Sequence, residues 1–168
     1  NEDYEQPTLS FWRYLSQGGP LPEQISATQI ALPDRGAATE FRGVDYRAWK
    51  LCLLSIFWRA SVAKAPIWSG IEVGPKHERV LREMILRGDP GSTFDYPCWL
   101  IVVTGGWRMI APGSGARLAG HRTFQIVLPR VMLSFFASSH VDRDLAALGP
   151  TPEGLVTALQ MEATKIPM

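Results

Sequence analysis

The sequence predicts an α+β domain whose helices cover one face of an antiparallel sheet. Its 168 residues are typical of one domain, and an apolar content of 46% suffices for a hydrophobic core without disulfide or metal support. Helical periodicity dominates the first half of the chain and strand-like segments the second, without the regular alternation that a parallel sheet requires. We therefore expect a central buried helix and an amphipathic helix packed on an antiparallel β-meander of three or four strands.

Residues 1–44 are expected to form an N-terminal arm and connector. Apolar residues within 8–16 predict a short helix, and the glycine- and proline-punctuated remainder predicts one short strand near 39–42. Residues 45–168 are expected to form a single α+β domain. Because the chain begins at Asn1 and not at a Met, this domain could also be the C-terminal part of a longer protein.

The segment Asp45–Ala63 predicts the central helix. Apolar residues recur at three- and four-residue steps and extend around almost the whole helix, so the fold has to enclose it. Asp45 is a favourable N-cap because its carboxylate accepts from free backbone N–H groups, and Pro66 limits the helix at its other end. The recurring apolar residues are Trp49, Leu53, Ile56, Phe57 and Ala60.

The amphipathic helix is expected to start at Pro75, because the missing N–H of proline costs nothing in a first turn. Residues 88–91, which include two glycines and a proline, end it. Its remaining surface is largely charged. The apolar stripe consists of Val80, Leu81, Met84 and Ile85.

Branched and aromatic residues predict strands after Pro97. Gly105 and Gly106 tolerate the positive φ of a tight hairpin, residues 113–120 are expected to be a loop, and a closing helix is expected from about 151 to 163. The predicted strands are 99–104, 107–110, 121–128 and 131–136.

The formal net charge of +1 gives no overall field that would attract nucleic acid or an anionic membrane. The middle segment, residues 46–130, nevertheless has 12 basic against five acidic residues, whereas both flanking segments are acidic. Two interpretations stay open: a basic face that binds phosphate, or charges that complement one another within one fold.

Cys52 and Cys98 are expected to be buried, reduced thiols, because both have apolar surroundings and neither has the spacing of a zinc or redox motif. No apolar run approaches the length of a membrane span, and no leader-like segment opens the chain. We therefore expect no membrane partner and a cytoplasmic location.

No motif identifies a catalytic residue, a cofactor or a metal site. The loop at 112–115 lacks the spacing of a nucleophile elbow or a phosphate-binding loop. His140, Asp142 and Asp144 are ligand types within five residues, but short loops of this composition are mostly ordinary turns. We therefore favour a non-enzymatic role, with no metal and no cofactor.

Arg59 interrupts the apolar surface of the central helix, one turn after Ser55. A buried guanidinium needs a partner, since an unpaired charge in low dielectric costs several kcal/mol. That partner is either a group of the fold or an anionic ligand such as phosphate. In the second case, the nucleic-acid- or anion-binding residues are Arg59, Lys64, Lys76, Arg79 and Arg82.

The run Tyr46–Ser61 (YRAWKLCLLSIFWRAS) resembles a signature of uncharacterised bacterial proteins. The similarity extends over about residues 45–137 and includes Gly74-Pro75, Asp89-Pro90-Gly91 and Tyr96-Pro97. Longer members of this group carry an N-terminal Cys/His cluster similar to HNH endonuclease modules. That cluster is absent from this chain, so the resemblance carries no nuclease activity over.

The resemblance implies a bacterial companion domain that acts in a nuclease or phage-defence context. Together with the basic residues, it leads us to expect a non-catalytic domain that engages nucleic acid. The alternative is a protein-interaction or scaffold module that uses the N-terminal arm and a sheet edge, with a protein partner or a second copy of itself.

Overall fold

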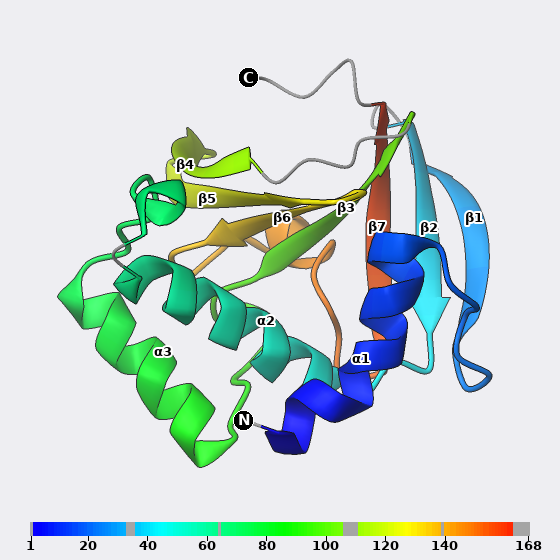
Figure 1. Ribbon diagram of the computed structural model, residues 1–168, viewed down its shortest axis with the longest axis horizontal. Coiled ribbons are helices and arrows are strands. Elements are labelled where there is room, and N and C mark those ends of the chain that lie inside the picture. The colour runs from blue at the N-terminus through cyan, green and yellow to red at the C-terminus, as the bar shows by residue number, and fades with distance from the viewer. Residues whose placement is uncertain (1, 33–35, 64, 106–110, 139, 163–168) are drawn as a thin grey trace.

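The computed structural model describes residues 2–32, 36–63, 65–105, 111–138 and 140–162, which form one sheet and its helices (Figure 1). The helices are α1 (Glu2–Gln17), α2 (Tyr46–Val62), the short 3-10 helix η1 (Pro66–Trp68), α3 (Pro75–Arg87) and α4 (Arg143–Ala146). The strands are β1 (Ser26–Leu32), β2 (Gly36–Arg42), β3 (Cys98–Thr104), β4 (Ala111–Leu118), β5 (His121–Leu128), β6 (Val131–Phe136) and β7 (Leu155–Glu162).

The sheet has seven strands in the order β1-β2-β7-β3-β6-β5-β4. Neighbouring strands are antiparallel except β3 and β7, which are parallel. The α+β class is confirmed, but the expected meander of three or four antiparallel strands is wrong. Strand β7 joins the hairpin β1–β2 to the later strands, so both ends of the chain build one mixed sheet.

Helix α2 is the central buried helix that its apolar pattern predicts. Asp45 caps it by accepting from the backbone N–H of Ala48 at 2.9 Å. The Phe57 ring is fully buried, stacks on Phe135 with ring centroids 4.6 Å apart, and packs against Phe124 of β5. No described helix, this one included, is long and apolar enough to span a membrane.

Helix α1 and strand β2 are parts of the same core. The Phe11 ring lies 4.9 Å from Trp49 of α2 and 5.1 Å from Phe41 of β2, measured between ring centroids. Trp12 also packs on Trp49. Residues 2–42, where an arm with one short strand was expected, thus supply a two-stranded hairpin and a helix to the fold.

Helix α3 follows α2 and packs on its flank (Figure 1). Leu81 and Ile85 are buried against the core, as the apolar stripe predicts. The helix ends at Gly88, whose left-handed backbone (φ 63°) closes the last turn, and the Arg47 side chain donates to the Gly88 carbonyl at 2.9 Å.

The predicted closing helix at 151–163 is wrong, because residues 155–162 form strand β7. Leu, Ala, Gln, Met and Glu favour a helix locally, but tertiary pairing overrides that preference. Val156, Thr157 and Ala158 are all buried between β2 and β3, so both faces of this strand are covered.

The expected loop at 113–120 is also wrong. Residues 111–118 form β4, which pairs with β5 despite its two glycines and has an irregular register between Ala111 and Ser114. The predicted strands 121–128 and 131–136 are confirmed as β5 and β6. The predicted strand 107–110 lies outside the described residues.

Replacing Phe57 by alanine tests whether the stability of the fold depends on α2. We expect Phe57→Ala to lower the free energy of unfolding by about 3–5 kcal/mol, through the reduced apolar burial and the cavity left behind. Val62→Ala in the same helix is the matched control, because Val62 is exposed and its truncation should cost less than about 0.5 kcal/mol. Urea denaturation measures both values, and equal decreases in the two variants would contradict this role of α2.

Candidate functional site

The structure places Arg59 at the surface, in the last turn of α2. Its Nε donates to the Ser55 carbonyl of the same helix at 3.3 Å. The expectation that the fold encloses this guanidinium is therefore wrong. The helix is buried along most of its length, but its last turn reaches solvent, where Val62 is also exposed, and a long side chain can extend its charge outward.

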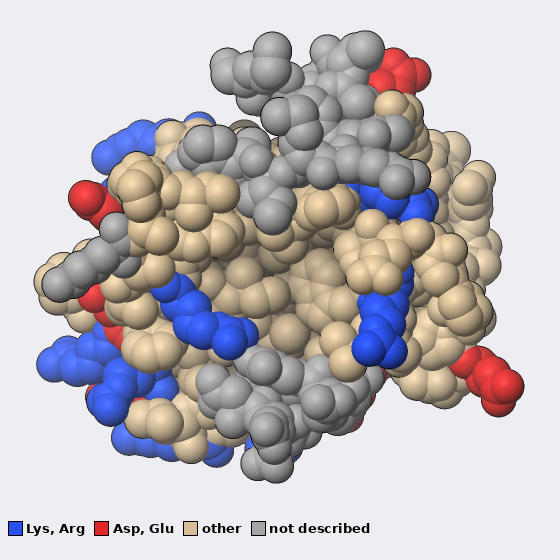
Figure 2. Space-filling view, viewed as in Figure 1, with Lys and Arg blue, Asp and Glu red and all other residues tan. Residues whose placement is uncertain are grey.

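Three of the other predicted residues, Lys76, Arg79 and Arg82, are exposed on α3. Among the described residues, none of the three forms a hydrogen bond or an ion pair through its side chain. Lys64 lies outside the described residues. Figure 2 shows lysine and arginine side chains gathered over α3, at the lower left of this face.

The sequence of α3 turns these cations outward. Leu81 and Ile85 bury one side of the helix, and three-residue spacing keeps Lys76, Arg79 and Arg82 together on the exposed side. Glu78 faces α2 instead, where its carboxylate accepts from the Ser61 hydroxyl at 2.8 Å. Because this acid is held toward α2 and the exposed Glu83 pairs with Arg87, the outer face of α3 keeps an excess of positive charge.

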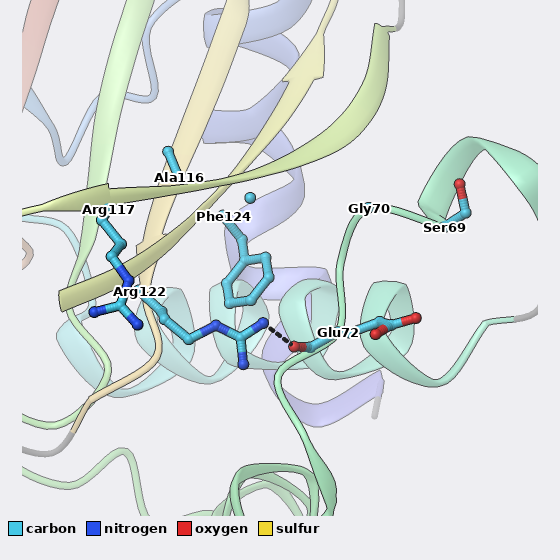
Figure 3. A pocket seen from close by; sticks show the side chains of 8 residues that line it. Ser69, Gly70, Glu72, Ala116, Arg117, Arg122 and Phe124 are labelled. Carbon is cyan, nitrogen blue, oxygen red and sulfur yellow. Dashed lines mark hydrogen bonds between the residues drawn. The ribbon is translucent and has the colours of Figure 1, made fainter.

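Two further arginines lie at a hollow of about 510 Å³ beside β4 and β5 (Figure 3). Arg117 and Arg122 stand directly opposite each other in the β4–β5 register. Arg122 donates to the Glu72 carbonyl at 2.9 Å and lies over the Phe124 ring, 5.2 Å from its centroid. These contacts fix Arg122 at one wall of the hollow.

Arg122 lies near the start of α3. Burial lowers the pKa of His77, and the positive charges of Lys76 and Arg122 lower it further. Both cations therefore act on the same imidazole, although they come from a helix and a strand. We call the surface formed by Lys76, Arg79, Arg82, Arg117 and Arg122 the basic surface.

The basic surface has the chemistry of an anion site. Like charges directly opposite each other on neighbouring strands repel, which weakens strand pairing unless an anion lies between them. Guanidinium groups also match phosphate oxygens with two parallel hydrogen bonds. In the described structure, neither Arg117 nor Arg122 forms an ion pair, although Glu72 lines the same hollow.

Arg117 and Arg122 were not predicted from the sequence, because the composition of 113–120 is typical of a loop. Gly120 was the local signal, because glycine favours the positive φ that a two-residue hairpin turn requires. In the structure, Ala119 and Gly120 both have positive φ, and such a turn fixes the register of the residues on either side. Recognising this turn would have placed the two arginines opposite each other.

Lys50 is a second residue that the sequence pattern did not indicate. Its side chain is 2% exposed in the first half of α2, and its Nζ donates to the Tyr46 hydroxyl at 3.3 Å and to the Ser92 carbonyl. The Tyr46 hydroxyl in turn donates to the Gly91 carbonyl at 3.0 Å. Through these hydrogen bonds, Lys50 and Tyr46 hold the loop after α3 against α2.

Burial lowers the pKa of Lys50 to about 8, an effect that the nearby negative charge of Asp95 opposes. Burial also raises the pKa of Tyr46 to about 12. A lysine with a lowered pKa can act as a nucleophile or base. Lys50 is enclosed and bonded to the loop, so it has a structural role in this arrangement.

Neither cysteine belongs to a metal-ligand cluster among the described residues. Both are free and buried, as predicted; the Trp12 indole donates to the Cys52 sulfur at 3.3 Å, and burial raises the pKa of the Cys98 thiol. No group of three or more His, Cys, Asp or Glu side chains suited to a metal ion occurs among the described residues, so His140, Asp142 and Asp144 do not form one there.

No family model, curated protein or solved structure matches this chain. The resemblance to bacterial proteins with an HNH-like cluster therefore stays a prediction. We infer function from the chemistry of the surface.

The lowered pKa of Lys50 predicts a pH dependence of stability. Between about 8 and its ordinary value of 10.5, the unfolded chain binds more protons at this residue than the folded protein does, so stability rises with pH in this window. From pH 8 to 10 we expect the free energy of unfolding to rise by about 2 kcal/mol relative to Lys50→Met.

Urea denaturation at several pH values measures this difference. Lys76→Met is the matched control, because Lys76 is exposed and its removal should leave the wild-type slope unchanged. Parallel pH profiles for wild type and Lys50→Met would show that burial does not perturb this amine.

Proposed function

We propose that this protein is a non-catalytic module that binds nucleic acid through the basic surface. The observation that carries the proposal is the set of five cations on α3 and the β4–β5 hairpin, which have no acidic side-chain partner among the described residues. Such a surface attracts the phosphate backbone, whose counterions are released on binding.

The side chains of the basic surface favour contacts to phosphate over contacts to bases. Trp68, in the 3-10 helix that packs against β4, is half-buried against the core and is not presented as an open stacking platform. Phosphate contacts carry no sequence information directly. We therefore propose binding with little sequence preference and with strong salt dependence.

The biological context of the proposal rests on the resemblance alone. Residues 45–137 resemble bacterial proteins associated with HNH-like modules, which suggests nuclease systems or phage defence. In such a system, a domain that holds nucleic acid would complement a nuclease that lies elsewhere.

Titration of labelled duplex DNA, single-stranded DNA and RNA at several salt concentrations tests this function. We expect binding on the order of 1–100 μM that weakens as salt rises, because each neutralised phosphate releases counterions. Arg79→Ala combined with Arg82→Ala should weaken binding. It should also reduce the slope of log K against log salt by about 0.9 for each phosphate that the variant no longer neutralises.

Arg42→Ala is the matched control, because Arg42 is an exposed arginine of β2 that pairs with Glu40 outside the basic surface. It should bind nucleic acid as the wild type does. Absence of binding at low salt, or equally weakened binding in the control, would refute the proposed interface.

Edge strand β1 favours a second candidate function, a protein-interaction module. Its seven residues contain no charge and no proline, and most of them are exposed. Edge strands of this kind offer unpaired backbone groups to another strand, and proteins usually protect them with charges or proline. An uncharged edge strand can pair with an identical strand, so the proposed partner is β1 of a second copy.

Light scattering over a range of protein concentrations tests this pairing. We expect a dimer that Thr28→Lys disrupts, since a lysine at the centre of an edge strand hinders strand addition. Thr28 lies opposite Glu40 in the register, so the added charge should be tolerated by the fold. Gln17→Lys, an exposed position of α1, is the control; a monomer at all concentrations would exclude this candidate.

A further inference from the structure

Arg130 lies in the two-residue turn between β5 and β6, beside the C-terminal end of α1 (Figure 1). Its backbone is left-handed, with φ 61°, and follows Pro129. This position of a turn normally holds glycine or asparagine. A bulky residue kept in a strained conformation often has a function that requires its side chain at that place.

The Arg130 side chain reaches the end of α1. Gly18, which follows α1 with a left-handed φ of 73°, leaves the space that the guanidinium occupies, since a Cβ at Gly18 would overlap Nη1 of Arg130. The side chain is half-buried. Among the described residues, none accepts a hydrogen bond from this guanidinium or forms an ion pair with it.

Two hollows lie beside Arg130, and both are lined by Arg130 and Val102. The larger, of about 700 Å³, lies between the end of α1 and the end of β3. The smaller, of about 300 Å³, includes Gln29, Thr39 and Gln160. These volumes are in the range of small-molecule sites. We call the two hollows together the Arg130 groove.

The chemistry of the Arg130 groove is that of a site for one negative charge. The described side chains that line it include no acid, and its polar groups besides Arg130 are amides and hydroxyls. The Gln160 amide already donates to the Thr39 hydroxyl at 3.2 Å, which holds this wall in place. Val102 and Phe41 add apolar surface.

We propose that the Arg130 groove binds a small organic anion. Arg130 holds the phosphate or carboxylate group of the ligand, and the amides, hydroxyls and apolar side chains contact an uncharged body. A guanidinium without a protein acceptor gives up hydrogen bonds to water when half-buried, and an anion restores them in a charge-assisted form. This inference is independent of the basic surface, whose cations come from other elements.

Calorimetric and thermal-shift titrations with matched pairs of probes test the proposal. Adenosine monophosphate and benzoate carry the two anionic groups, and adenosine and benzamide are their neutral counterparts. We expect at least one anion to bind and to raise the unfolding midpoint. Its neutral counterpart should bind at least about tenfold more weakly, because it cannot form the charged hydrogen bonds. Binding of adenosine monophosphate would identify a phosphate ligand, and binding of benzoate would identify a carboxylate ligand.

Arg130→Asn is the main variant, because asparagine accepts a left-handed backbone and should keep the protein folded. We expect it to weaken anion binding about tenfold or more without lowering the unfolding midpoint of the free protein. Arg117→Ala is the matched control and should leave this binding unchanged, while it affects the basic surface. Absence of binding by both anions, equal binding of the neutral probes, or unchanged binding by Arg130→Asn would overturn the proposal.

Discussion

The burial of α2 is the constraint on which the rest of the structure depends. Its apolar side chains point in almost every direction, so a sheet beneath one side is not enough to cover it. Strands β5 and β6 cover it through Phe124 and Phe135, α1 covers a second side through Phe11, and α3 covers a third. Because α3 buries its apolar stripe against α2, its cations lie on the opposite side, together with Glu83 and Leu86.

Local signals in the sequence predicted those elements whose ends depend on nearby residues. Asp45 and Gly88 fix the ends of α2 and α3, and the turn at 129–130 separates β5 from β6. Strand β7 could not be predicted in this way. Its conformation depends on β2, more than a hundred residues earlier, and on β3, and neither pairing leaves a periodic signal within 155–162.

The same distinction between local signals and long-range pairing applies to the candidate site. Exposure of Lys76, Arg79 and Arg82 follows from the helical period, so the sequence predicts it. The opposed pair of Arg117 and Arg122 depends on strand register, which cannot be predicted when residues 113–120 are assigned to a loop. The buried cation was predicted at the wrong end of α2: Arg59 is exposed in the last turn, while the loop after α3 covers Lys50 near the start of the helix.

The charge gradient along the chain has two interpretations, and two ion pairs of the fold each lie within one element. Arg42 pairs with Glu40 and Arg87 pairs with Glu83, and each of these two pairs joins neighbours in the sequence. Neither joins the basic segment 46–130 to the acidic segments that flank it. The proposed functions follow the first interpretation, in which the excess charge of residues 46–130 faces outward. In these proposals the charge lies on an open surface suited to a polymer and, at Arg130, in a groove suited to one small anion.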